Sequence, residues 1–207
     1  MVLNGLEELK DFIDEVDTKN KEFVWTELER DYAIELINLT SVESLFKDCS
    51  FSKIDLRGID TSEVIDMSRM FYHCSNLKIL NISDLNTEKV TNMSEMFYGC
   101  FMLEELSMDR ICTYSVTNMD AMFQLCSNLK NLDISNFDLS NVNEDSYMWM
   151  FGGTDALESV KVPKSLSENN LSKMFLGNQD KVTIERVFSN MSLNNKKDGS
   201  FCTTSLF

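Results

Sequence analysis

A period of 26 residues runs through the middle of this sequence. Segments that begin at Val64, Val90 and Val116 align without gaps, and a fourth from Val142 carries two extra residues before its Met-Phe pair. A degenerate copy, one residue short, precedes them from Ser41 to Glu63. One such copy cannot bury its own apolar side chains, whereas stacked copies can, so the period predicts a solenoid of about five repeats.

The register places the same residue types in the same columns. The main columns hold methionine (Met70, Met96, Met122, Met150), phenylalanine (Phe71, Phe97, Phe123, Phe151), cysteine (Cys49, Cys74, Cys100, Cys126) and leucine (Leu77, Leu103, Leu129, Leu157). If the copies stack, like residues from neighbouring copies meet in one shared interior. We therefore expect these columns to form the core.

Each copy combines two local patterns. Met93, Met96, Phe97 and Cys100 recur at i, i+3, i+4 and i+7, a spacing typical of one helical face. The alternation around Leu106 and Met108 predicts a short strand. The expected fold is α/β: a leucine-rich-repeat-like solenoid with a parallel sheet on one face, short helices on the other and a helical N-terminal cap.

The two ends of a solenoid must cover its core. Residues 1–40 are predicted to be a helical N-terminal cap, since Leu6, Leu9, Phe12, Ile13 and Val16 share one helical face. Residues 41–164 form the predicted repeat solenoid. Residues 165–207 form a predicted C-terminal cap and tail, in which Met174-Phe175 begins a closing unit.

The string Val90-Thr91-Asn92-Met93-Ser94-Glu95-Met96-Phe97 resembles the 26-residue repeat of bacterial surface proteins, a BspA-like branch of the leucine-rich repeats. The resemblance extends from Ser41 to about Pro163. It implies a leucine-rich-repeat solenoid with a role in protein contact. It supplies no catalytic residue that could be transferred to this chain.

The charge is strongly acidic, with a formal net charge of −15. Residues 1–60 carry −8, residues 61–160 carry −10 and residues 161–207 carry +3. Such a surface repels nucleic-acid backbones and is attracted to a protein with a basic surface. The alternative is that the acidity serves only solubility.

The predicted strands define a candidate partner-binding surface. Side chains alternate across a strand, so the neighbours of the inward leucines face outward. They form three columns of outward positions: Ile79, Glu105 and Asn131; Asp55, Asn81, Ser107, Asp133 and Lys161; Ser83, Asp109 and Ser135. The surface is polar and acidic, with Ile79 as a possible anchor, and the alternative is a merely solvated face.

The sequence contains no pattern that indicates a catalytic site. The cysteine column has no C-x-x-C pair and an interval of 26 residues, so it indicates a core position rather than a metal or redox site. His73 is the single histidine and occupies a variable position of the repeat. We therefore predict a protein that is not an enzyme, with no catalytic residues, no metal and no cofactor.

The N-terminus lacks the basic and apolar regions of a signal peptide, and no window is apolar enough to cross a membrane. The expectation is a cytoplasmic protein of a bacterial host. The leading hypothesis is a module that binds, and inhibits, a basic nucleic-acid-handling protein, as a phage counter-defence inhibitor would. The alternative is a fragment of a surface adhesin that binds host proteins. An enzyme of unrecognised class is a third hypothesis.

Overall fold

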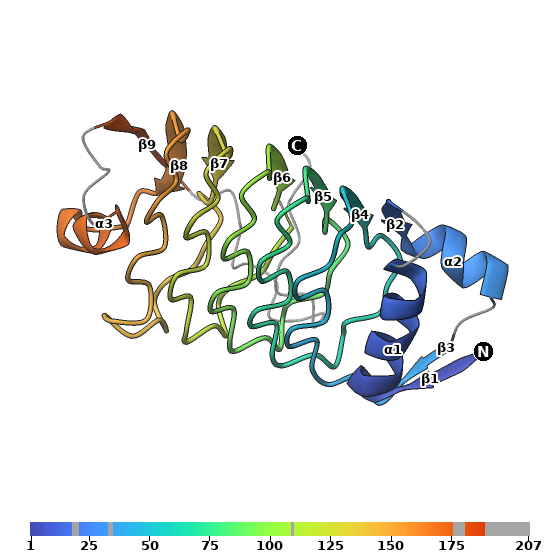
Figure 1. The fold of residues 1–207 in the computed structure, drawn as a ribbon. Coiled ribbons are helices and arrows are strands. Elements are labelled where there is room, and N and C mark those ends of the chain that lie inside the picture. The colour runs from blue at the N-terminus through green and yellow to red at the C-terminus, as the bar shows by residue number, and fades with distance from the viewer. Residues whose placement is uncertain (18–20, 33–34, 109, 176–180, 189–207) are drawn as a thin grey trace.

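The computed structural model describes residues 1–17, 21–32, 35–108, 110–175 and 181–188. Its central part is a row of short parallel strands, one from each copy of the repeat (Figure 1). We number the copies as coils 1 to 5, which begin at Leu39, Val64, Val90, Val116 and Val142. Their strands are β4 (Lys53–Asp55), β5 (Ile79–Asn81), β6 (Glu105–Ser107), β7 (Asn131–Asp133) and β8 (Ser159–Pro163).

The strands pair in the register that the period predicts. Leu80 lies opposite Ile54 and Leu106, and Leu132 lies opposite Val160. The predicted parallel-strand solenoid is therefore confirmed. The strand ladder continues past both ends of the repeats, because β2 (Glu22–Val24) pairs with β4 and β9 (Thr183–Val187) pairs with β8.

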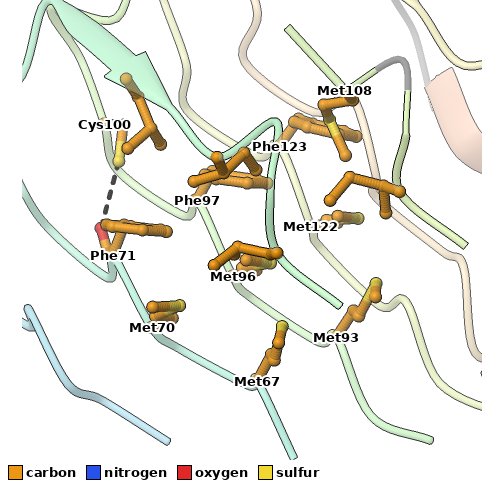
Figure 2. Close-up of a cluster of buried hydrophobic side chains, with 14 of the residues drawn as sticks. Met67, Met70, Phe71, Met93, Met96, Phe97, Cys100, Met108, Met122 and Phe123 are labelled. Atoms are coloured by element: carbon orange, nitrogen blue, oxygen red, sulfur yellow. Dashed lines mark hydrogen bonds between the residues drawn. The ribbon is translucent and has the colours of Figure 1, made fainter. Parts of the chain in front are cut away.

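The interior is a stack of equivalent side chains. The rings of Phe46, Phe71, Phe97, Phe123 and Phe151 lie parallel to within 10°, with centroids 5.4 to 5.7 Å apart from coil to coil. Figure 2 shows the methionine columns beside these rings in the same interior. All five rings are buried, which confirms the predicted shared core.

The prediction of short helices on the second face is wrong. In the described residues between 38 and 163 the structure contains no α-helix, and residues 67–74 and their equivalents form consecutive tight turns instead. This chain of turns points two residues inward and then two outward. It therefore produces the same i, i+3, i+4, i+7 spacing as a helical face. A helix is about 10 Å wide, so one helix per strand at a spacing of about 4.8 Å requires a strongly curved solenoid, whereas stacked turns do not.

Backbone hydrogen bonds explain the stability of the chain of turns. In coil 2 the odd-numbered residues from Met67 to His73 donate their N–H groups to carbonyls of coil 3, at 2.7 to 3.0 Å. The even-numbered residues from Met70 to Cys74 donate to the carbonyl three residues back, at 2.9 to 3.3 Å. The N–H of Ser68 donates to Oδ1 of Asp66. Every backbone donor of this buried segment is thus satisfied, as burial requires.

Two positions in each chain of turns adopt a left-handed backbone. In coil 2 these are Arg69 (φ 56°) and His73 (φ 57°), and in coil 3 they are Glu95 (φ 54°) and Gly99 (φ 71°). For a residue other than glycine this conformation costs about 1–2 kcal/mol. At Gly99 glycine is required for a second reason, since a Cβ there would lie 2.9 Å from Cδ2 of His73 in the preceding coil.

The strand ladder is interrupted between coils 3 and 4. β6 ends one sheet and β7 begins the next, and Leu106 is only half-buried, unlike Leu80 and Leu132. The side-chain amide of Asn136 crosses this junction and donates to the carbonyls of Met108 and Ile111, at 3.1 and 3.2 Å. The chain of turns continues through the same junction with regular hydrogen bonds.

Two helices lie at the N-terminal end of the stack (Figure 1). They are α1 (Gly5–Asp17), which buries Leu9, Phe12, Ile13 and Val16, and α2 (Trp25–Tyr32). Short strands that the sequence analysis did not predict also lie in residues 1–40: β1 (Val2–Asn4) pairs with β3 (Glu35–Ile37), and β2 belongs to the sheet of the solenoid. Phe23 of β2 packs edge-on against Phe46 and begins the core.

At the C-terminal end, α3 (Glu168–Phe175) takes the place of a further chain of turns. The N–H groups of Trp149 and Phe151 donate to the carbonyls of Lys173 and Met174. Phe175 stacks on Phe151 with a centroid distance of 4.7 Å, so Met174-Phe175 does close the core column. Of the predicted C-terminal region, residues 189–207 lie outside the described residues.

Candidate binding surfaces

The strands present the predicted sheet-face positions in adjacent pairs. Ile79 lies beside Glu105, and Asn81 beside Ser107. Ile79, the apolar residue among these predicted positions, is 45% exposed. Asn131, Asp133 and Ser135 lie beyond the interruption, on or just after β7. Asp109 lies outside the described residues.

Several of these side chains bond to one another at the ends of the strands. Oδ1 of Asn81 accepts the N–H and the Oγ–H of Ser83, at 3.2 and 2.9 Å. Oδ1 of Asp133 does the same with Ser135, at 3.0 and 2.6 Å. Such bonds to a residue two positions later are how Asn and Asp stabilise turns. These four residues therefore have a structural role where the strands end.

Asp55 does not present its carboxylate to solvent as predicted, since it is only 6% exposed. Arg57 lies over it, with Nη2 2.7 Å from Oδ2 and Nε 3.0 Å from Oδ1. Burial acts to raise the pKa of Asp55. The hydrogen bonds and positive charge of Arg57 outweigh it and hold that pKa below its ordinary value.

The sheet face is also less acidic than predicted. Lys53 pairs with Glu22 at 3.2 Å, and Lys161 pairs with Asp133 at 3.6 Å. The position before each strand alternates in sign along four coils, with Lys78, Glu104, Lys130 and Glu158, all of them exposed. The acidity is greater on α1, which holds six carboxylates and one lysine in 13 residues. The sheet face is a surface of mixed charge.

The chain of turns carries a group of stacked aromatic side chains, which we call the aromatic cluster: Tyr72, His73, Tyr98 and Phe101. The His73 ring stacks on Tyr72 at 4.5 Å and on Tyr98 at 5.5 Å, and Tyr72 stacks on Tyr98 at 5.0 Å. Phe101 meets the His73 ring edge-on at 6.0 Å. The rings are half-buried, and Phe101 is 37% exposed.

Charged groups border the aromatic cluster. The guanidinium of Arg69 lies 6.0 Å from the ring centroid of Tyr72, and Nζ of Lys47 lies 5.8 Å from it. Glu95 holds Arg69 through two hydrogen bonds of 3.0 Å. The aromatic cluster and the neighbouring Arg69 therefore present Tyr, Phe and Arg on a rigid stack, residue types that are enriched at the centres of protein interfaces.

The repeating columns gave no indication of the aromatic cluster. Tyr72, His73, Tyr98 and Phe101 occupy positions that vary from copy to copy. The available signal was a gathering of aromatic residues at variable positions of adjacent copies. In a solenoid such positions face outward and come within contact distance.

The cysteine column is a set of buried hydrogen-bond donors. The thiols of Cys74, Cys100 and Cys126 each donate to the carbonyl of a phenylalanine in the preceding coil, at 2.9 to 3.1 Å. Burial raises the pKa of the Cys74 and Cys126 thiols well above its ordinary value. A neutral thiol is neither a good nucleophile nor a good metal ligand, which agrees with the structural interpretation of this column.

A pocket of about 440 Å³ lies at the turn that follows β5, lined by residues 83–88, Arg110 and Cys112. Its charged groups have both signs, and Arg110 lies 3.8 Å from Asp84. Within the described ranges, no three His, Cys, Asp or Glu side chains come together as a metal site would need. None of the helices in the described part of the chain has both the length and the hydropathy of a transmembrane segment.

Residues 40–161 match a family described as "Mycoplasma protein of unknown function, DUF285". The match takes in more than half of the 207 residues. The chain belongs to this family. The DUF285 family is grouped with BspA-like repeats, which agrees with the resemblance seen in the sequence. No curated protein and no solved structure matched the chain.

The DUF285 match coincides with the five coils. It begins at Thr40, next to the first residue of coil 1, and ends at Lys161 in β8. The sheet-face positions and the aromatic cluster lie inside this range, whereas α1, α2, α3 and β9 lie outside it. Both candidate surfaces are thus built on the repeats that define the family.

Proposed function

We propose that this chain is a non-catalytic protein-binding module that contacts its partner mainly through the aromatic cluster. The supporting observation is the half-exposed stack of Tyr72, His73 and Tyr98 with Phe101 beside it. Side chains that stack on one another are already ordered, so binding costs little conformational entropy. In this proposal the leucine-rich-repeat-like solenoid is a rigid support for that surface.

The partner that we propose is a protein with a basic surface. The net charge of −15 supports this partner, because long-range attraction speeds association with a positively charged protein. The same charge repels nucleic acid and so disfavours its direct binding. In its specific form, the module acts in the cytoplasm and inhibits a nucleic-acid-handling protein of a bacterial host, as a phage-borne inhibitor would.

A surface adhesin is the second candidate, and the membership of a family grouped with BspA-like repeats favours it. The two candidates differ in their partners. The adhesin binds proteins of a host cell or its matrix, whereas the inhibitor binds a protein of the cytoplasm in which it is made. Localisation of the native protein by cell fractionation distinguishes them.

The test compares two surfaces of one protein. Affinity capture with the wild-type chain identifies a partner, and a triple variant Tyr72→Ala, Tyr98→Ala, Phe101→Ala is then measured against it. A matched variant of the sheet face, Ile79→Ala with Glu105→Ala, tests the surface that the sequence predicts. We expect the first variant to weaken binding by about 100-fold or more, since one hot-spot aromatic alone contributes about 2 kcal/mol and the contributions of neighbouring residues do not simply add.

The variants must first be shown to fold, by cooperative urea unfolding. Equal losses in both variants, or a loss only in the sheet-face variant, would contradict the proposed surface. Turnover of any substrate by the purified chain would contradict the non-catalytic proposal.

A further inference from the structure

Coil 5 departs from the repeat at one place, immediately before its chain of turns. Met93 donates its N–H to Asn118, 25 residues later, whereas the equivalent Met119 donates to Ser146, 27 residues later. The two extra residues therefore precede Ser146, in a segment that contains Glu144 and Asp145. Their side chains are 83% and 87% exposed. In repeat proteins, insertions of this kind often lie on the binding face.

Lys173 of α3 fixes the inserted loop. Its Nζ lies 3.3 Å from both the carbonyl and Oε2 of Glu144, and 3.8 Å from Oδ1 of Asp145. The main-chain carbonyl of the same lysine accepts the N–H of Trp149 at 3.3 Å. Loop, helix and Trp149 therefore form one unit, in which two carboxylates share one ammonium and leave a net negative charge.

Trp149 is the most conspicuous residue of this unit. Its side chain is 47% exposed, whereas Trp25, the other tryptophan, is 2% exposed. Its backbone is left-handed, with φ 56°. Gly152 leaves room for the indole, since a Cβ at that glycine would lie 3.3 Å from Cε3 of Trp149. The left-handed backbone belongs to the repeat, since Arg69 and Glu95 have it at the equivalent positions. The exposed indole is specific to this coil, and it leaves a large apolar and aromatic surface available for contact with a partner.

Tyr147 supplies an independent observation at the same place. It is 2% exposed, and its hydroxyl has no hydrogen-bond partner in the described residues. Burial raises the pKa of Tyr147, the charge of Lys173 lowers it, and the charges of Glu144 and Asp145 raise it. A buried hydroxyl without a partner is unusual in a folded protein and marks a place where a donor or acceptor is lacking.

We propose that Trp149, Glu144 and Asp145 form a binding point for an arginine side chain of a basic partner. This inference rests on the proposed function in so far as the partner is basic. The planar guanidinium stacks on the face of an indole and pairs with carboxylates at its edge. The negative net charge of the unit matches such a side chain, and Lys173 connects the two parts, since its ammonium contacts both carboxylates and its carbonyl accepts the N–H of Trp149.

Fluorescence quenching provides the test, with a synthetic eight-residue peptide of alternating glycine and arginine as the probe. Acrylamide quenches an exposed indole and not a buried one, so the quenchable emission of the native protein comes from Trp149. We expect the peptide to protect Trp149 from acrylamide in a saturable way. A peptide with citrulline in place of arginine keeps the shape without the charge and is expected to give no protection.

Charge variants separate a local site from general attraction. Glu144→Gln with Asp145→Asn is expected to weaken peptide binding by about tenfold, as expected for a cation that loses both ion pairs beside an indole. Asp11→Asn with Asp14→Asn makes the same change of net charge on the exposed face of α1. This control variant is expected to change the affinity for the peptide by no more than about twofold, since salt screens charges on α1 from a site at the other end of the stack.

Equal losses in the two charge variants, or protection by the citrulline peptide, would overturn the inference. The Trp149→Ala variant, followed by anisotropy of a labelled peptide, must lose binding while Ile65→Ala, an exposed apolar control, retains it. These outcomes do not depend on capture of a natural partner. Failure of the arginine site is therefore distinguishable from failure of the proposed function.

Discussion

The chains of turns in coils 2 and 3 begin with an Asp or Asn followed two residues later by Ser. Oδ1 of Asp66 accepts both the N–H and the Oγ–H of Ser68, and Oδ1 of Asn92 does the same with Ser94. Coil 4 has Asp120 in place of the serine. Its N–H still donates to Asn118, but its own Oδ1 is buried and lacks a hydrogen-bond partner in the described residues.

Asp120 is expected to destabilise the fold at neutral pH. Burial, with a smaller contribution from Glu95, raises the pKa of Asp120, so the folded state disfavours its ionised form. Replacing it by the residue of coils 2 and 3, Asp120→Ser, is predicted to increase the free energy of unfolding by about 1 kcal/mol. Because the folded pKa is raised, the penalty appears as pH rises through it, and the gain shrinks as pH falls toward 4.

Urea unfolding of the wild type and Asp120→Ser at pH 7 and at lower pH measures both effects. A variant that is no more stable than the wild type at pH 7, or one whose advantage increases on acidification, would show that the carboxylate is not under strain.

At the scale of the element, the chain of turns shows what a periodic sequence can and cannot reveal. The sequence predicted the columns, their burial and the strands correctly, because these depend on which residues face inward. It predicted helices in place of turns, because both place Met93, Met96, Phe97 and Cys100 on one side. The partners of the backbone N–H groups, which lie in the next coil, distinguish the two structures, and residue spacing alone does not contain them.

The candidate sites had the same limit. Outward positions such as Ile79 and Glu105 followed from alternation along a strand, and the structure brings those two together. The hydrogen bonds that Ser83 donates to Asn81 and Arg57 donates to Asp55 depend on how the chain bends after the strand, which the period does not define. The aromatic cluster required knowledge of which variable positions become neighbours.

Gly99→Ala tests the chain of turns as an element. The added Cβ meets the His73 ring and also makes the left-handed backbone unfavourable, so we expect a loss of about 2 kcal/mol in the free energy of unfolding. In a His73→Ala background the steric part disappears, and the same substitution should cost about 1 kcal/mol. A double-mutant cycle by urea unfolding measures the difference. Identical costs in both backgrounds would show that the ring does not occupy the space over Gly99.

For the molecule as a whole, neighbouring coils are similar but not interchangeable. A bulky side chain at the position of His73 is followed in the next coil by Gly99, and Leu125 is followed in the same way by Gly153. A Cβ at Gly153 would lie 2.6 Å from Leu125 Cδ2. The order of the coils therefore matters, even though each presents the same core columns.

Two deletions of equal length test this dependence on order. Removal of residues 116–141 (coil 4) brings Gly99 next to Gly153 and preserves every core column. Removal of residues 90–115 (coil 3) places His73 next to Leu125, where the glycine is lost. We expect both proteins to fold, with the second less stable by about 1–3 kcal/mol because of overpacking. Circular dichroism and urea unfolding measure it, and equal stabilities would contradict the packing argument.

The interruption between β6 and β7 has a mechanical consequence. Between coils 3 and 4 the turn side is joined by a regular hydrogen-bond ladder, while in the described residues β6 and β7 do not pair and side chains such as Asn136 and Thr113 make the bonds on that side. Under tension along the stack, the two sides should yield unequally, and the molecule should bend open at this junction before any coil unravels. A rod with one such joint can adjust its curvature to the shape of whatever it is pressed against.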